Sequence, residues 1–200
     1  IGQLCLLHHV PQLDCKRLII VGCGKQQELN ERNYQKIYQR LWQTLKELPV
    51  SEAVSYLTDL QIKGRNLYWN VRFAIETLEH GNYQFDNFKQ QKAPAIKLQK
   101  LLFSTDDATI CHAQAIAHGM RATRDLANQP PNICNPAYLA EQAQALAAKS
   151  NKVSVEILDE AQMAELGMQA YLAVSRGATN PAYLSLIKFN NAPNPDAKPI

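Results

Sequence analysis

The pattern of apolar and polar residues changes period several times along the chain, and each period indicates one kind of element. Residues 4–7 and 17–21 have the short apolar runs of strands, and the second run is nearly continuous, as in a buried parallel sheet. After Asn30, apolar residues recur every three or four positions, which predicts a helix that ends at Pro49. Its predicted buried face consists of Tyr34, Ile37, Tyr38, Leu41, Trp42, Leu45 and Leu48.

The alternation of strands and helices continues to about residue 128. We expect a strand at residues 53–57, a helix at residues 66–80 that Gly81 ends, and a strand at residues 97–103. Ser104 or Thr105 then fits the N-cap of a long helix to about residue 128. This helix passes through Ala108, Cys111, Ala115, His118 and Ala122.

A second group of elements follows a segment that is rich in asparagine and proline. Asn135 fits a helix N-cap, with Pro136 at the first helical position, where the fixed φ of proline is favourable. The further predicted elements are a strand at residues 153–158, a helix with Asp159 and Gln162 as a capping box and Gly167 as its end, and a strand at residues 183–189.

This order of elements indicates an α/β protein in two blocks that divide near residue 128. The chain has 200 residues, of which 46% are hydrophobic and 20% are charged, as in ordinary globular proteins. Its longest apolar runs are a handful of residues, so we expect no membrane-spanning segment. The first residues lack the basic and long apolar regions of a signal peptide, and we expect the chain to begin inside a domain.

Cysteine content and charge further limit the class of protein to which the chain can belong. The five cysteines form no Cys-x-x-Cys pair and their number is odd, which favours free thiols in a reducing cytoplasm over a disulfide scaffold or a structural zinc site. The net charge is +3, but residues 1–100 carry 14 Lys and Arg against 9 Asp and Glu. A basic first half permits contact with nucleic acid without requiring it.

Residues that could carry metal chemistry are scarce. The sequence contains no His-Glu-x-x-His motif, and no histidine follows His118. His8 and His9 are neighbours on a predicted strand, so they point to opposite faces. Asp106 and Asp107 diverge on a helix, and a favourable interaction with the helix dipole explains them better than a catalytic carboxylate pair.

The segment at residues 121–143 joins a helix end, a stiff Asn/Pro passage and a new helix start, which predicts a rigid connection between two folded bodies. Arg121 and Asp125 have the i, i+4 spacing of a helical ion pair. Arg124 either anchors the connection or lies at a domain or subunit interface. The candidate hinge or interface residues are Arg121, Arg124, Asp125, Asn128, Pro130, Pro131, Asn132 and Pro136.

At these residues the chain resembles a known family. The run TRDLANQPPNICNPAYLAEQAQALA is similar to the junction segment of the leucyl aminopeptidase (cytosol aminopeptidase) family, in which Arg-Asp-Leu-x-Asn-x-Pro-Pro-Asn precedes a helix opened by proline. The similarity continues through VEILDEAQMAELGMQAYLAVSRGATNPAYL and is looser upstream. The matching positions there are Leu158, Asp159, Leu166, Gly167, Met168, Val174, Gly177 and Pro181.

The resemblance implies an α/β fold in which a macro-domain-like amino-terminal domain is joined by a long helix to an α/β catalytic domain. It implies a cytoplasmic metalloaminopeptidase that removes amino-terminal residues, often leucine, from peptides. Two divalent ions, manganese, zinc or magnesium, would activate a hydroxide nucleophile. It also implies a homo-oligomer, a hexamer, and no membrane partner.

The family's metal-binding segments, Gly-Lys-Gly-x-x-Phe-Asp-x-Gly-Gly and Asn-Thr-Asp-Ala-Glu-Gly-Arg, do not occur in this sequence. We therefore assign no catalytic or metal-binding residue to it and expect it to be inactive alone. We expect residues 1–104 to form the amino-terminal domain without its first strands, residues 105–128 the linking helix and residues 129–200 the start of the catalytic domain. The acids after Arg124 are scattered: Asp125, Glu141, Glu156, Asp159, Glu160, Glu165 and Asp196.

Three hypotheses follow for the whole protein. The first is an aminopeptidase to which this segment contributes scaffold and oligomer contacts. The second is a DNA-binding or regulatory role of the basic amino-terminal domain, since some bacterial members of the family bind DNA. The third is a catalytically inactive subunit used only for assembly.

Overall fold

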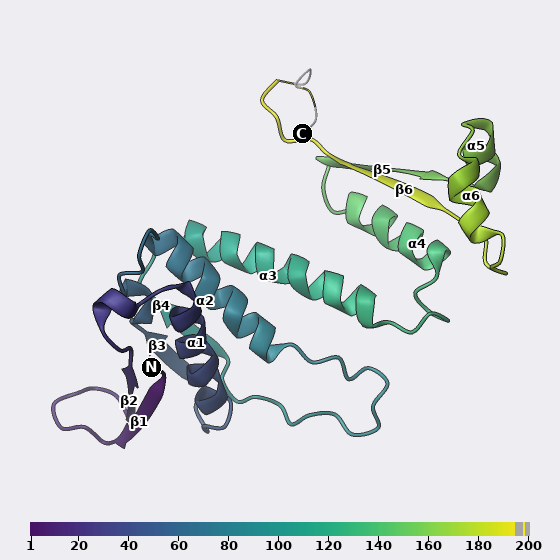
Figure 1. Cartoon of the computed structure of the whole chain (residues 1–200). Helices are drawn as coiled ribbons and strands as arrows, with labels where there is room; N and C mark the ends of the chain where they lie inside the picture. Colours follow the sequence, from purple (N-terminus) through teal and green to yellow (C-terminus); the bar gives the residue numbers. More distant parts are fainter. Residues whose placement is uncertain (195–197, 199–200) are drawn as a thin grey trace. The chain divides into compact units, whose positions relative to one another are not determined.

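The computed structural model describes residues 1–194 and residue 198. The chain divides into two compact units, residues 1–125 and residues 126–200, and helices and strands alternate in both (Figure 1). The predicted α/β class is confirmed. In the described part of the chain, no helix combines the length and apolarity needed to cross a membrane.

The first unit contains most of the elements. They are β1 (Gln3–His8), β2 (Arg17–Gly22), the short 3-10 helix η1 (Gln26–Glu28), α1 (Glu31–Leu45), β3 (Glu52–Ser55), the 3-10 helix η2 (Leu57–Asp59), α2 (Leu67–Asn82), β4 (Lys100–Phe103) and α3 (Asp107–Asn128), whose last residues belong to the second unit. The predicted strand at residues 53–57 is shorter because the chain turns into η2.

The core of the first unit is built on α1. The predicted face of this helix is buried through Leu45, and Tyr34, Ile37 and Tyr38 are fully inaccessible to solvent. Burying each of these side chains stabilises the fold by about 1.5–3 kcal/mol. Residues of β2, β3, β4 and α2 pack against this face: Ile19, Val21, Ala53, Leu101, Phe103, Ala74 and Leu78.

Two helix starts in this unit follow the sequence rules. The Asn30 side chain accepts a hydrogen bond from the Asn33 N–H at 3.0 Å, as the prediction for α1 requires. Asn66 caps α2 in the same way, with the Trp69 N–H as donor at 2.9 Å. Each cap satisfies one backbone donor that the first helical turn leaves without a partner.

The predicted end of α2 at Gly81 is wrong, because the helix continues through this glycine to Asn82. Gly81 has a packing role: a Cβ atom built on it would lie 2.8 Å from Cδ1 of the Trp42 ring. Only glycine allows α2 to approach the α1 tryptophan so closely.

The cap of α3 also differs from the prediction. Neither Ser104 nor Thr105 caps it; Asp106 accepts hydrogen bonds from the backbone N–H and the hydroxyl of Thr109, at 2.8 and 2.9 Å. These bonds to Thr109 hold the pKa of the Asp106 carboxyl below its ordinary value. The buried face of α3 is Thr109, Ala113 and Ala117, whereas the five residues through which the helix was expected to pass are exposed.

The strands of the first unit form two separate pairs. β1 pairs with β2 in antiparallel orientation, with Cys5 opposite Ile20. β3 pairs with β4 in parallel, with Val54 opposite Leu102. The sequence indicated that β2 belongs to a parallel sheet. This prediction is wrong for the edge of β2 that pairs with β1.

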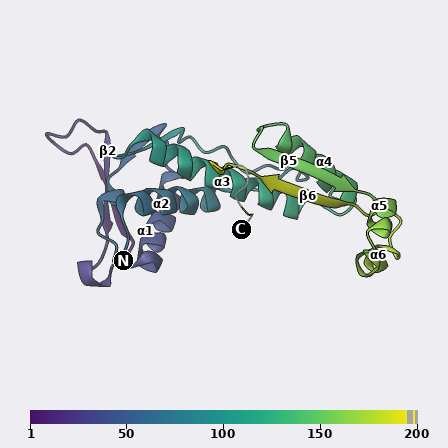
Figure 2. The same ribbon diagram turned by 90° about the horizontal axis from the view of Figure 1, so that it is seen from above.

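The second unit contains α4 (Pro136–Ala147), β5 (Val153–Leu158), α5 (Glu160–Glu165), α6 (Gln169–Ser175) and β6 (Leu184–Phe189). β5 and β6 form an antiparallel pair, and α4 lies along it (Figure 2). The predicted capping box is present, since the Asp159 carboxylate accepts from the Gln162 N–H and the Gln162 side chain accepts from the Asp159 N–H, both at 2.9 Å. A small core gathers Leu158, Met163, Leu172 and Ala182.

Candidate functional site

The candidate residues at the end of α3 that belong to the first unit face α2. Arg121 forms an ion pair with Glu79, and both side chains are partly exposed to solvent. Asp125 accepts a hydrogen bond from the Tyr83 hydroxyl at 2.8 Å. The predicted i, i+4 pair between Arg121 and Asp125 is therefore replaced by two contacts between helix α3 and the end of α2.

Arg124 lies on the same side as these contacts. Its guanidinium carbon is 3.8 Å from the centre of the Tyr83 ring, a cation–π geometry. Its Nη1 atom donates to the His80 carbonyl oxygen at 3.4 Å and lies 3.4 Å from Nδ1 of the same histidine. The Tyr83 ring thus contacts the Arg124 guanidinium while its hydroxyl donates a hydrogen bond to the Asp125 carboxylate, so Tyr83 connects these two residues.

Sequence reasoning did not identify Tyr83, because its partners lie about forty positions away in the chain and no local motif connects them. The available signal was the pair of adjacent charges Arg124 and Asp125 at the end of a helix. Adjacent side chains on a helix diverge, so Arg124 and Asp125 do not pair with each other, and each is placed to reach a partner on another element.

The candidate residues of the second unit form a turn between two helices. The Pro130 carbonyl accepts hydrogen bonds from the N–H groups of Ile133 and Cys134, both at 2.9 Å. Asn135 then caps α4 by accepting from the Tyr138 N–H at 3.0 Å, and the helix begins at Pro136 as predicted. Asn128 is the last residue of α3 and is exposed, Pro130 is half-buried, and Pro131, Asn132 and Pro136 are also exposed.

Three of the acids of the second unit have structural partners. Asp159 belongs to the capping box, and Glu160 accepts a hydrogen bond from the Ala182 N–H at 2.8 Å. Glu156 lies 4.0 Å from the Lys188 ammonium group on the neighbouring strand. Asp196 lies outside the described residues. Across residues 1–194 and 198, no three His, Cys, Asp or Glu side chains gather as metal ligands, so these residues do not fit a dinuclear metal centre.

Polar groups inside the first unit support the core. Tyr34 donates its hydroxyl to the Asn70 carbonyl at 3.1 Å, and the Tyr38 hydroxyl lies 3.3 Å from the Ser55 hydroxyl oxygen. Burial raises the pKa of Tyr38 to about 12 and raises the pKa of Tyr34 further. Both phenols therefore remain neutral near pH 7 and serve packing and hydrogen bonding.

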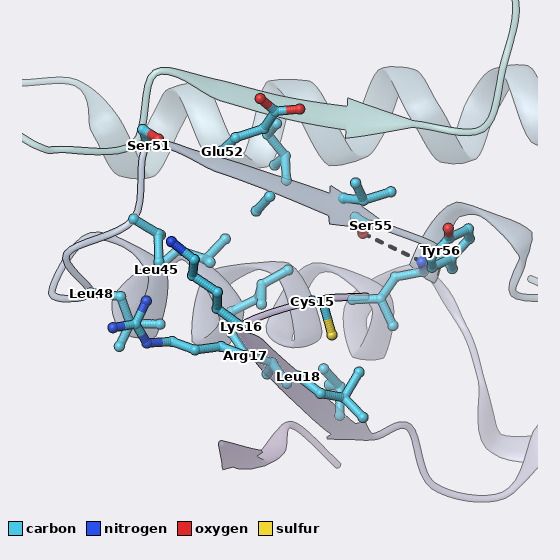
Figure 3. A pocket seen from close by; sticks show the side chains of 18 of the residues that line it. Cys15, Lys16, Arg17, Leu18, Leu45, Leu48, Ser51, Glu52, Ser55 and Tyr56 are labelled. Atoms are coloured by element: carbon cyan, nitrogen blue, oxygen red, sulfur yellow. Dashed lines mark hydrogen bonds between the residues drawn. The ribbon is translucent and has the colours of Figure 1, made fainter. Parts of the chain in front are cut away.

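A cavity of about 850 Å³ between β2 and β3 was not expected from the sequence (Figure 3). Lys16 and Arg17 lie at the start of β2 on one side of it, and Glu52 lies on β3 on the other. Leu41 and Leu45 of α1 also line the cavity. Its lining combines strand edges with the apolar face of a helix and contains no set of metal ligands.

Comparison with known proteins gives two family matches. Residues 1–92 match the model of the cytosol aminopeptidase family, N-terminal domain, and residues 121–200 match the model of the cytosol aminopeptidase family, catalytic domain. The whole chain is 56% identical to the cytosol aminopeptidase of Haemophilus influenzae strain Rd and 48% identical to a probable cytosol aminopeptidase of Pasteurella multocida. It spans 42% of the length of each of these relatives.

Solved structures support the fold. The chain is similar to the bottromycin maturation enzyme BotP in complex with Mn, with a TM-score of 0.76 over 93% of this chain and 39% of that one. A second BotP structure aligns with a TM-score of 0.74 over 90% of this chain and 38% of that one. Sequence identity is 19% and 20%, respectively, so these matches concern the arrangement of helices and strands alone.

Proposed function

Because the chain belongs to the cytosol aminopeptidase family, we propose that it is part of an aminopeptidase that removes amino-terminal residues, with leucine preferred, from peptide substrates. The observation that carries this proposal is the pair of family matches, which cover the two parts of the chain in the order of an N-terminal and a catalytic domain. The 56% identity to the Haemophilus influenzae cytosol aminopeptidase supports it.

The described residues supply scaffold and contacts rather than chemistry. Since they contain no cluster of metal ligands, the two divalent ions of the proposed enzyme, manganese, zinc or magnesium, require ligands outside the described residues. The proposed protein works in the cytoplasm as a homo-oligomer, a hexamer.

In the proposed domain organisation, residues 1–104 form the amino-terminal domain, residues 105–128 a linking helix and residues 129–200 the start of the catalytic domain. The contacts of Arg121, Arg124 and Asp125 with α2 support an anchored helix end. The turn at Pro130 supports a defined start for the next helix. In the full-length protein, replacing Pro131 with glycine should lower kcat/KM for a peptide while the unfolding transition of the first unit, followed by the fluorescence of Trp42 and Trp69, stays unchanged.

The proposed activity is tested with the full-length protein. It should release leucine from a leucyl amide, lose this activity when a chelator removes divalent metal, and regain it when metal returns. Residues 1–200 alone should show no turnover. Turnover by residues 1–200, or an inactive full-length protein after metal is restored, would contradict the assignment.

The two other hypotheses have less support. The matched relatives are described as aminopeptidases, which gives no support to a DNA-binding role. Retention of duplex DNA in a mobility-shift assay that disappears as salt increases would favour that role, because counterion release makes such binding salt-dependent. Folded full-length protein without turnover in the presence of metal would favour an assembly subunit.

A further inference from the structure

The connection between α2 and β4, residues 83–99, is the longest in the first unit without a helix or strand. In Figure 1 it runs as an open loop from the end of α2 back to the start of β4. Connections longer than about 12–15 residues without secondary structure are uncommon in compact domains and are often functional. Neither the sequence pattern nor the contacts of the helix ends assign a role to this α2–β4 connection.

Both ends of the α2–β4 connection are fixed to the first unit. At its start, the Tyr83 hydroxyl donates to the Asp125 carboxylate of α3 at 2.8 Å. Near its end, Ile96 and Leu98 pack against the core built on α1. The Ser51 carbonyl accepts hydrogen bonds from the two N–H groups that follow Leu98, at 2.8 and 3.1 Å. The two ends therefore stay in place whatever happens between them.

The middle of the connection is exposed along its whole length. Each of the residues 87–95, with the sequence NFKQQKAPA, is exposed, and even the apolar Phe88 side chain is 60% exposed. The cations of this stretch are Lys89 and Lys92. Exposed loops with small and polar residues are the preferred sites of cleavage by endopeptidases, because the enzyme must bind several consecutive residues in extended form. Lysine directs the cut to the bond on its carboxyl side when the endopeptidase is of the trypsin type.

Local contacts distinguish the lysines of the connection. The Lys89 N–H donates to the Asp86 carbonyl at 3.0 Å, and the rings of Phe85 and Phe88 are 5.8 Å apart, so a turn holds the chain just before Lys89. Lys97 lies between two residues that pack against the core, so extending the chain there requires opening the start of β4.

Lys92 has no such restraint. Within the described part of the chain, residues 90–95 make no hydrogen bond and no ion pair. The bond after Lys92 leads to Ala93, and Pro94 comes one position later, so the scissile nitrogen is that of an ordinary peptide. The Lys92–Ala93 bond is thus the basic-residue bond of this connection that extends most easily.

From these observations we propose that the α2–β4 connection is a site of proteolytic modification, at which an endopeptidase specific for basic residues hydrolyses the Lys92–Ala93 bond of the folded protein. Water adds across the C–N bond, which leaves a carboxylate on Lys92 and an amino group on Ala93, and the step requires no oxidant or reductant. The proposal does not depend on the proposed peptidase activity.

The two products remain associated after the cut. β4 stays paired with β3 along the register from Glu52 with Lys100 to Ser55 with Phe103. The side chains of β4 that face α1 stay in the core. The contacts of α3 with α2 also cross the cut, since Arg121 pairs with Glu79 and both residues lie outside the connection. The modification therefore divides the polypeptide without dividing the first unit.

Brief digestion of the full-length protein with trypsin under native conditions tests this proposal. The earliest cut in the first unit should leave a fragment that ends at Lys92, identified by its mass, because an aminopeptidase does not alter that end. The two fragments should elute together in size-exclusion chromatography and separate only in denaturant. An earliest cut at another position of the first unit, no cut before the protein unfolds, or fragments that separate without denaturant would overturn the proposal.

Two lysine variants with matched chemistry give a second test. Lys92→Gln should slow the first cut at least about fivefold and move it to Lys89, because the turn before Lys89 must open first. Lys97→Gln removes a neighbouring exposed lysine of the same connection and should leave the rate unchanged. An unchanged rate for Lys92→Gln, or a slower cut for Lys97→Gln, would show that the scissile bond is elsewhere and would overturn the proposal.

Discussion

Replacing Gly81 with alanine adds one methyl group, which has two opposing effects on the free energy of unfolding. In an exposed helix interior, Gly→Ala stabilises by about 0.5–1 kcal/mol, because alanine loses less backbone entropy on folding. At Gly81 the new methyl would lie 2.8 Å from Cδ1 of Trp42 and 3.3 Å from its Nε1 atom, closer than carbon atoms approach without displacement.

Which effect is larger depends on whether the Trp42 ring can move away from the new methyl group. Trp42 is 8% exposed and belongs to the core of the first unit, so its ring has little space in which to move. Overpacking a core of this kind typically costs about 1–3 kcal/mol. The clash outweighs the helix propensity, and we expect Gly81→Ala to lower the free energy of unfolding by about 1 kcal/mol.

Gly119 provides the matched control. It lies inside α3, and a Cβ atom built on it would meet no atom within 4 Å, so Gly119→Ala should raise the free energy of unfolding by about 0.5–1 kcal/mol. Urea titrations followed by tryptophan fluorescence report on this unit, since Trp42 and Trp69 both lie in it. If Gly81→Ala stabilised the protein as much as Gly119→Ala, the reasoning on the Trp42 contact would be refuted.

Three further predictions concern other parts of the chain. Met163 is fully buried in the second unit, so Met163→Ala should lower the free energy of unfolding by about 2–5 kcal/mol, measured by far-UV circular dichroism in urea; a loss below 1 kcal/mol would contradict its place in that core. Burial raises the pKa of Tyr38 to about 12, above the value of about 10 in the unfolded chain. The contribution of this burial to stability is therefore present below pH 10 and is lost as pH rises toward 12. In urea titrations from about pH 8 to 12, the free energy of unfolding should fall less for Tyr38→Phe than for the parent. Tyr83→Phe should cost about 1 kcal/mol through the lost bond to Asp125 while the ring contact with Arg124 remains, and a double-mutant cycle with Asp125→Asn should give a coupling energy that differs from zero.

The sequence predicted best where local rules determine the structure. Asn30, Asn135 and the pair Asp159 with Gln162 cap their helices as expected, because a cap needs only backbone donors within three residues. The short helix α6 was missed: seven residues give less than two full turns of periodic signal, and its N-cap residue Met168 makes no side-chain cap. The cavity between β2 and β3 was missed because strand pairing depends on residues far apart in the chain.

The errors at Gly81 and Arg121 have one physical cause. Local rules assign a helical glycine to a helix end and a charged residue to a partner four positions away. In the structure, both positions instead take long-range partners, the Trp42 ring and the Glu79 carboxylate. An exposed i, i+4 pair contributes only a few tenths of a kcal/mol, so any tertiary contact that also positions a helix outweighs it. A close approach between helices likewise outweighs helix propensity at Gly81, because only glycine fits there even though propensity favours a larger residue. The face that α2 turns toward α1 and α3 is therefore where sequence-based assignments should fail first, and where substitutions should have effects opposite in sign to their local propensities.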